Sequence, residues 1–243
     1  MTVADSWLIL VALGAGALGG LIGTGSSLVL LPILVVLDGP RVAVPVMAIA
    51  AVMANVGRVM AWWRLIRWRP VLVYSCPGVP AAVLGAHTLL TIPQSVVENV
   101  LGAFFLVMIG VRRVVAARQW RVRLWHLAIA GAVVGFLTGL ILSTGPLSVP
   151  VFTGYGLSGG TFLGTEAASA MVLYIAKMAT FDQLGALDHT VIIRGLVIGT
   201  ALMIGPFLAR PLVRRLDTKA YGLLIDVVLV VAGLGMFAAT ISS

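Results

Sequence analysis

Two short polar stretches interrupt otherwise apolar runs and contain residue types that bind anions. The first is Thr24-Gly25-Ser26-Ser27, and the second is Ser143-Thr144-Gly145-Pro146. If each stretch breaks a helix, the helix that follows presents unpaired backbone N–H groups and the positive end of its dipole. Ser26 and Ser27 are residue types that cap a helix start, and Gly25 allows a tight turn. Hydroxyls and backbone donors converging in this way predict a site for a small anion.

The same residue types have a second use, because small side chains let membrane helices pack closely. For the glycines that precede the first stretch we favour this packing interpretation; they are Gly16, Gly19, Gly20 and Gly23. For the two polar stretches themselves we favour the anion site.

Four further polar side chains lie inside apolar segments, where ionisable groups are functional candidates: Asn55, Glu166, Lys177 and Asp226. Lys177 could supply positive charge to an anionic substrate, or extend to the outer membrane interface. Asn55 could line a cavity or form a hydrogen bond between helices. Glu166 could start a helix, pair with an arginine or carry a coupling proton. Asp226 could carry such a proton or pair with a cytoplasmic arginine.

The residues that would support catalysis or metal binding are scattered. The three histidines, His87, His126 and His189, are far apart in the sequence, and Cys76 is the single cysteine. No nucleotide-binding motif occurs. We therefore expect no catalytic centre, no metal site and no cofactor.

The composition places these residues in a membrane. Hydrophobic residues make up 60% of the 243 residues and charged residues 10%, whereas soluble domains average about 45–50% and about 25%. The net charge of +8 comes from short basic clusters between apolar segments, which are typical of cytoplasmic membrane flanks. We therefore expect a lipid bilayer around an all-α polytopic protein and no nucleic-acid partner, with a homo-oligomer left open.

About eight apolar segments follow one another along the chain, and the first and fifth are interrupted: 7–37, 43–63, 70–90, 96–111, 124–157, 161–181, 190–208 and 219–240. The interrupted stretch "GALGGLIGTGSSLVLLP" is matched by "GAVVGFLTGLILSTGPLSVP" in the second half. Matched interruptions in two halves are typical of transporter binding sites. We expect a first repeat over 1–115, a basic cytoplasmic linker over 116–123 and a second repeat over 124–243.

The basic residues indicate the topology. If the two interrupted segments are re-entrant hairpins, three loops fall on one face and carry 13 of the 16 basic residues, with Arg58 counted among them. This arrangement satisfies the positive-inside rule and puts both termini outside. Each repeat then has one broken-helix hairpin and three crossings, so the second repeat is inverted relative to the first.

Three stretches carry a resemblance to a known family: "GALGGLIGTGSSLVLLPIL", "CPGVPAAVLGAHTLLTIP" and "GPFLARPLVRRLDTKAY". Together they resemble the sulfite exporter TauE/SafE family of membrane permeases. The resemblance implies transport of small sulfur-containing anions or organic acids across the bacterial inner membrane. It places the anion-site region at Gly25, Ser26, Ser27, Thr144 and Gly145, where serines replace glycines that are usual in the family.

The favoured function is therefore a secondary transporter for a small anion, with a midplane site that is exposed alternately to the two sides. An anion channel would use the same polar stretches without coupling. An intramembrane enzyme is a third class, which the scattered histidines and the lone cysteine argue against.

Overall fold

A computed structural model of the chain describes residues 3–23, 25–93, 96, 121–140 and 145–213. Every regular element in these ranges is helical. In chain order, the helices are α1 (Val3–Ile22), α2 (Gly25–Asp38), α3 (Pro40–Trp62), the short 3-10 helix η1 (Trp63–Leu65), α4 (Trp68–Thr91), α6 (Leu124–Leu140), α7 (Gly145–Gly154), α8 (Gly159–Gln183) and α9 (His189–Val213). The apolar segments at 96–111 and 219–240 lie outside the described residues.

Three of the described helices are long and apolar enough to cross a membrane: Arg41–Leu65, Trp68–Thr91 and His189–Pro211. Helix α8 is as long as these, but it carries two buried charged side chains, Glu166 and Lys177. Shorter apolar helices cover Leu8–Leu21, Val29–Asp38 and Leu124–Leu140. The chain is thus a multi-pass, all-helical membrane protein in the described ranges.

The two interruptions expected from the sequence are real helix breaks. Helix α1 ends at Ile22 and α2 begins at Gly25, while α6 ends at Leu140 and α7 begins at Gly145. The tight turn of the first break is at Gly23, whose φ of 89° suits glycine; the expectation of Gly25 was wrong. Because α2 already begins at Gly25, Ser26 and Ser27 lie in its first turn. The expectation that they cap the helix was wrong.

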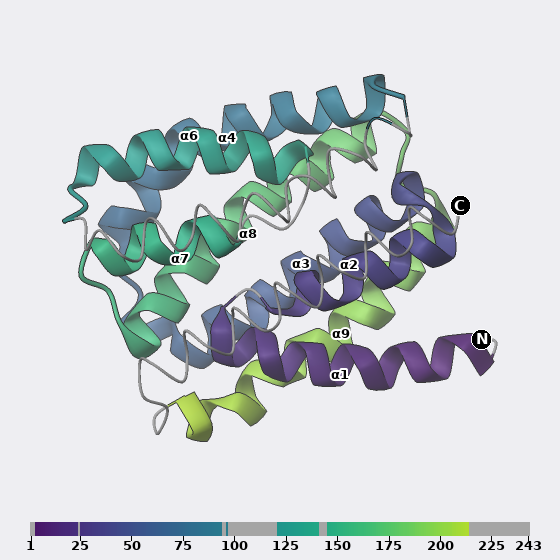
Figure 1. The fold of residues 1–243 in the computed structure, drawn as a ribbon, viewed down its shortest axis with the longest axis horizontal. Helices are drawn as coiled ribbons and strands as arrows, with labels where there is room; N and C mark the ends of the chain where they lie inside the picture. Colours follow the sequence, from purple (N-terminus) through teal and green to yellow (C-terminus); the bar gives the residue numbers. More distant parts are fainter. Residues whose placement is uncertain (1–2, 24, 94–95, 97–120, 141–144, 214–243) are drawn as a thin grey trace.

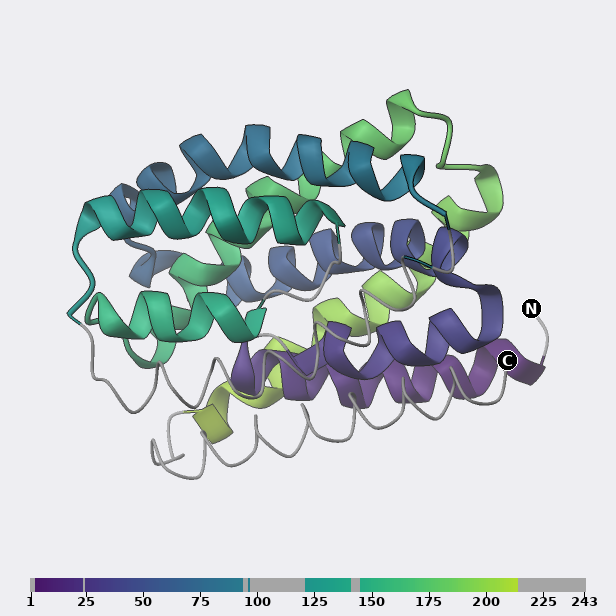
Figure 2. The same cartoon turned by 45° about the horizontal axis from the view of Figure 1, so that its top comes forward.

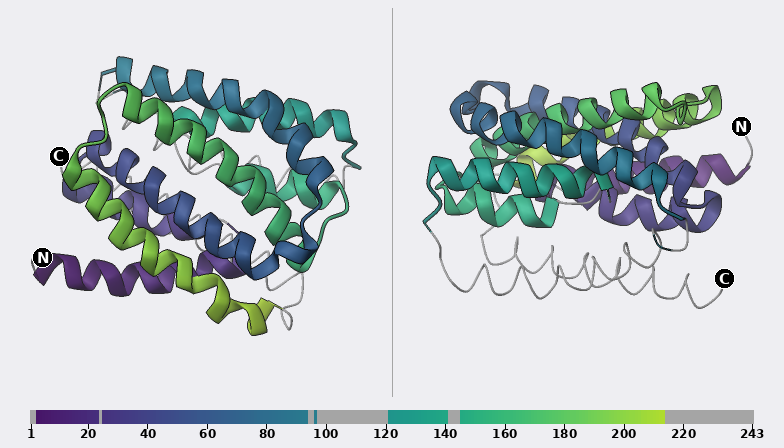
Figure 3. Two further views of the ribbon diagram at one scale, coloured as in Figure 1. Left: turned by 180° about the vertical axis from the view of Figure 1, so that it is seen from behind. Right: turned by 90° about the horizontal axis from the view of Figure 1, so that it is seen from above.

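Each broken helix folds back on itself as a hairpin. Figure 1 shows α1 and α2 open toward the end of the bundle that holds the N-terminus, whereas α6 and α7 open toward the opposite end. Figure 2 shows the same reversal, with α7 running back beneath α6. The longer helices α3, α4, α8 and α9 run between the two ends, and the α8–α9 loop lies at the same end as the N-terminus (Figure 3).

Each hairpin is held by a helix from the other half of the chain. Helix α1 packs against α9, and α6 packs against α4. Gly16 and Gly20 lie against the backbone of α9, where a Cβ on Gly20 would meet Pro206. Gly135 lies in the same way against Gly78 of α4. Close packing was the favoured interpretation for Gly16, Gly19, Gly20 and Gly23. It is confirmed for Gly16 and Gly20, and for Gly19, which lies against Ser26, whereas Gly23 forms the turn of the first break.

Candidate functional site

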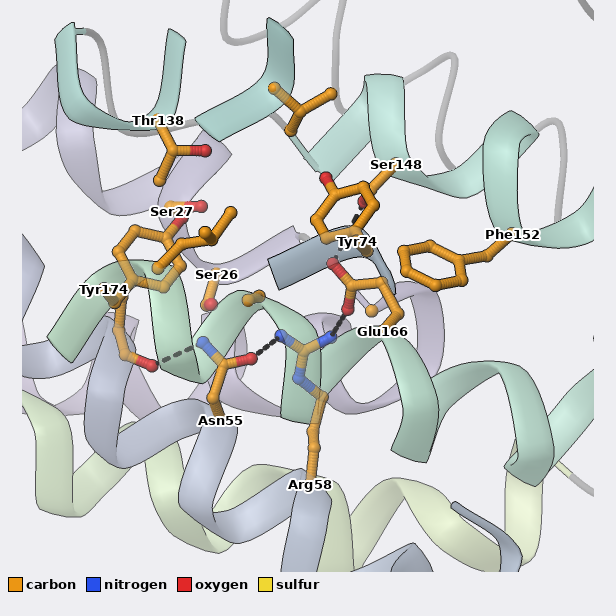
Figure 4. A pocket seen from close by; sticks show the side chains of 15 residues that line it. Ser26, Ser27, Asn55, Arg58, Tyr74, Thr138, Ser148, Phe152, Glu166 and Tyr174 are labelled. Atoms are coloured by element: carbon orange, nitrogen blue, oxygen red, sulfur yellow. Dashed lines mark hydrogen bonds and ion pairs between the residues drawn. The ribbon is translucent and has the colours of Figure 1, made fainter. Parts of the chain in front are cut away.

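The first helix break and the two helices of the second hairpin line one cavity between the halves of the chain. Gly23, Ser26 and Ser27 line it from the first break, and Thr138 and Ser148 line it from the helices on either side of the second. Val134 of α6 and Phe152 of α7 also line it. Helices α3, α4 and α8 supply the rest of the lining: Ala51, Asn55, Arg58, Tyr74, Glu166, Ala170, Leu173 and Tyr174. Figure 4 shows these side chains gathered around a common space.

A buried ion pair crosses this cavity. Nη1 of Arg58 on α3 lies 2.6 Å from Oε2 of Glu166 on α8, and the two side chains are only 8% and 4% exposed. The other carboxylate oxygen, Oε1, accepts a hydrogen bond of 3.0 Å from the Ser148 hydroxyl on α7. Both oxygens of Glu166 are therefore engaged, by groups from two different helices (Figure 4).

The guanidinium of Arg58 also reaches the first break. A Cβ at Gly23 would lie 3.3 Å from Nη1 of Arg58, so the missing side chain of glycine leaves room for the cation. Nη2 of Arg58 donates to Oδ1 of Asn55, and Nδ2 of Asn55 donates to the carbonyl of Ala51 at 2.7 Å. The amide thus fixes the plane of the guanidinium. One continuous network connects the first break with Ser148, just beyond the second.

Four of the eleven residues expected at the site from the sequence come together here. Ser26, Ser27, Asn55 and Glu166 all line the cavity. Both hydrogen bonds of the Asn55 amide stay within α3, so the expected bond between helices is not formed in the described part of the chain. Gly25 and Gly145 are the first residues of α2 and α7. The remaining expected site residues, Thr24, Ser143, Thr144 and Asp226, lie outside the described residues.

Lys177 is buried but does not line the cavity. Its side chain is fully enclosed, so the alternative that it extends to the membrane interface is wrong. Nζ donates a hydrogen bond of 2.8 Å to the carbonyl of Thr138 and lies 5.2 Å from the ring centre of Phe181. Thr138 lies near the end of α6 as described. Lys177 therefore ties α8 to the part of α6 that precedes the second polar stretch.

Arg58 is the main functional residue that the sequence interpretation misplaced. It was counted in a cytoplasmic loop, but it lies within α3 and is 6% exposed. Two signals could have found it: its position inside the apolar segment 43–63, and the three-residue spacing from Asn55, which puts both on one helix face. Arg58 pairs with Glu166, so the alternative that Glu166 pairs with an arginine is confirmed. Tyr74 and Tyr174 were also missed as lining residues.

The chemistry that the cavity offers is recognition of an oxyanion. A planar guanidinium, serine hydroxyls and the first turn of a helix are all donors suited to negatively charged oxygens. The cavity volume is about 30 Å³, which is room for one or two water molecules. A larger guest requires the surrounding helices to separate.

Comparisons with known proteins agree with this picture. The chain is 25% identical over 206 residues to "Probable membrane transporter protein YjnA" of Bacillus subtilis (strain 168), a match that covers 75% of this chain and 81% of that protein. No solved structure matches the chain. The family model described as "Sulfite exporter TauE/SafE" matches residues 8–236, nearly the whole sequence. The chain therefore belongs to the sulfite exporter TauE/SafE family and is a membrane transporter.

Proposed function

We propose that this protein is a secondary transporter that moves a small sulfur-containing oxyanion, sulfonate or organic acid across the inner membrane. The observation that carries the proposal is one cavity that contains the guanidinium of Arg58 and is lined by the first helix break and by both helices of the second hairpin. The family name refers to sulfite, and the donors around the cavity suit an anion of that kind.

The binding mode follows from the donors. The anion is held by Arg58, by the hydroxyls of Ser26 and Ser27, and by the N–H groups in the first turn of α2. The start of α7 contributes from the other half, while Ser148 stays bonded to Glu166. Helix N-termini at broken helices bind anionic groups of substrates in other transporters.

Alternating access by two inverted repeats fits the arrangement of the helices. The two hairpins open toward opposite ends of the bundle. The packing is also reciprocal: α1 packs on α9 and α6 on α4, while α3 packs on α9 and α8 on α4. This is the pattern expected if two similar halves are related by a two-fold axis in the membrane plane. The cavity at the interface of the halves would then open first to one side and then to the other.

The first test is anion binding to the purified protein, measured as thermal stabilisation. The panel is sulfite, thiosulfate, methanesulfonate and acetate, with chloride at equal ionic strength as the reference. The double variant Ser26→Ala/Ser27→Ala removes both hydroxyls from the cavity. Ser169→Ala is the matched control, because Ser169 is also buried but donates within α8 to the carbonyl of Thr165 and does not line the cavity.

Stabilisation that the double variant loses and Ser169→Ala retains would support the site and identify the substrate class. If no anion stabilises the protein more than chloride, the proposed function is wrong. A channel remains the second candidate, since it would use the same donors. Counterflow in proteoliposomes separates the two, because a preloaded anion accelerates uptake by a transporter but does not do so in a channel.

A further inference from the structure

We propose that Glu166 is the proton-carrying counter-ion of the transport site, which the substrate anion displaces from Arg58 as Glu166 takes up a proton. This inference rests on the anion transport proposed above and adds the coupling ion. It is carried by the geometry of the ion pair, whose cation lies among the proposed anion donors.

The first step of the argument concerns space and partners. In the described structure Arg58 gives Nη1 to Glu166 and Nη2 to Asn55. An incoming oxyanion competes with Glu166 for Nη1 of Arg58, because both are negatively charged oxygens that accept from a guanidinium. Glu166 is in this sense a tethered substitute for the substrate.

The second step concerns charge. The pair of Arg58 and Glu166 is neutral, so an anion that entered alone would leave a net negative charge in a buried site. A proton that enters with a monovalent anion keeps the site neutral. Glu166 is the acceptor at hand, because arginine does not release its own proton in proteins.

The other groups around Glu166 do not offer a better acceptor. The titratable side chains that share its cavity in the described part of the chain are Arg58 on α3, Tyr74 on α4 and Tyr174 on α8. The other polar groups there are hydroxyls and the Asn55 amide. Lys177 is about three helical turns farther along α8 and faces the Thr138 carbonyl instead. Glu166 is therefore the one carboxylate among the lining residues described.

The proton step is balanced as follows. Water on the open side gives a proton to Oε2 of Glu166 as the bond from Arg58 Nη1 breaks. Oε1 keeps its hydrogen bond from Ser148. The anion then accepts the freed Nη1–H. When the anion leaves on the other side, Glu166 returns its proton to water and pairs again with Arg58, so one proton crosses with each anion.

The test measures proton uptake on binding in weakly buffered wild-type protein with a pH-sensitive dye. The added anions are methanesulfonate, thiosulfate and sulfite, and a protein-free run subtracts the titration of the anion itself. We expect about one proton taken up per anion bound. We also expect the affinity to rise about tenfold for each unit that the pH falls, over the range where Glu166 is ionised in the free protein.

Glu166→Gln should bind the same anion without proton uptake and with an affinity that does not depend on pH. Asp38→Asn is the matched control. Oδ1 of Asp38 lies 2.8 Å from Nη1 of Arg194, and neither residue lines the cavity. This variant should keep both the proton uptake and the pH dependence. The wild-type measurement does not depend on the stability of either variant.

The outcomes separate the two proposals. If no anion binds the wild-type protein, the proposed function fails and the inference falls with it. If an anion binds without proton uptake, the inference is wrong and the transport site stands. If the pH dependence survives in Glu166→Gln and is lost in Lys177→Met, Lys177 carries the proton and the inference is also wrong.

Discussion

Removing the charge of only one partner in the buried pair of Arg58 and Glu166 should destabilise the protein far more than removing both charges. The side chains are 8% and 4% exposed and the Nη1–Oε2 distance is 2.6 Å, so neither charge has much access to water. Removal of one partner from such a pair costs about 3–5 kcal/mol, because it leaves an uncompensated buried charge. We therefore expect Glu166→Gln and Arg58→Gln each to lower the free energy of unfolding by about 3–5 kcal/mol.

The double variant Arg58→Gln/Glu166→Gln leaves no uncompensated buried charge at this position, so it should cost much less than the sum of the two single changes. The coupling energy between the two sites should thus reach at least about 3 kcal/mol. The assay is equilibrium unfolding in mixed micelles by increasing SDS, followed by circular dichroism. All four proteins of the cycle are measured at the same pH.

The pair of Asp38 and Arg194 is an internal control for this cycle. Its Nη1–Oδ1 distance is 2.8 Å, but its side chains are 19% and 28% exposed. Partly exposed pairs are worth about 0–1 kcal/mol, so the cycle of Asp38→Asn and Arg194→Gln should give a coupling energy in that range. If the two cycles give equal coupling, or if the Arg58 and Glu166 variants are additive, burial does not determine the energy of the pair and the reasoning is refuted.

Three further changes test the surroundings of the site. Gly135→Val should lower the free energy of unfolding by about 1–3 kcal/mol, because a Cβ there overlaps Gly78; Gly14→Ala, with nothing within 4 Å, should be neutral or stabilising by about 0.5–1 kcal/mol in the same SDS assay. Gly23→Ala should cost about 1–2 kcal/mol for its positive φ and should also weaken anion stabilisation, since the added Cβ lies beside Arg58; an unchanged anion response would mean that Arg58 takes no part in binding. In a Cys76→Ala background, which removes the exposed native thiol, an impermeant maleimide added outside should label Asp188→Cys and not Arg64→Cys, and the reverse labelling would invert the proposed orientation.

Local features of the fold were accessible from the sequence. The helix breaks at Gly23 and before Gly145 could be anticipated, because small residues interrupt apolar runs that would otherwise continue as helix. Close packing at Gly16 and Gly20 followed from residue size in the same way. These features depend on residues that are neighbours in the sequence.

The ion pair could not be anticipated in this way. Arg58 and Glu166 are 108 positions apart, and their contact depends on α3 packing against α8. An arginine five residues before a basic loop looks like part of that loop, because one and a half helical turns separate a buried position from an interfacial one. The fully buried position of Lys177 was obscured for a related reason: its acceptor is a backbone carbonyl of another helix, 39 positions away in the sequence, and no residue type marks such a group.

The reciprocal packing of the hairpins has a consequence for how the chain is made. The face that Gly16 and Gly20 present is covered by α9, which is among the last parts of the described chain to be synthesised. At about 5–20 residues per second, the first hairpin waits roughly ten to forty seconds for its partner. During that time its glycine face must be shielded by lipid, by the insertion machinery or by a chaperone. The second hairpin has no such delay, because α4 is already in place when α6 emerges.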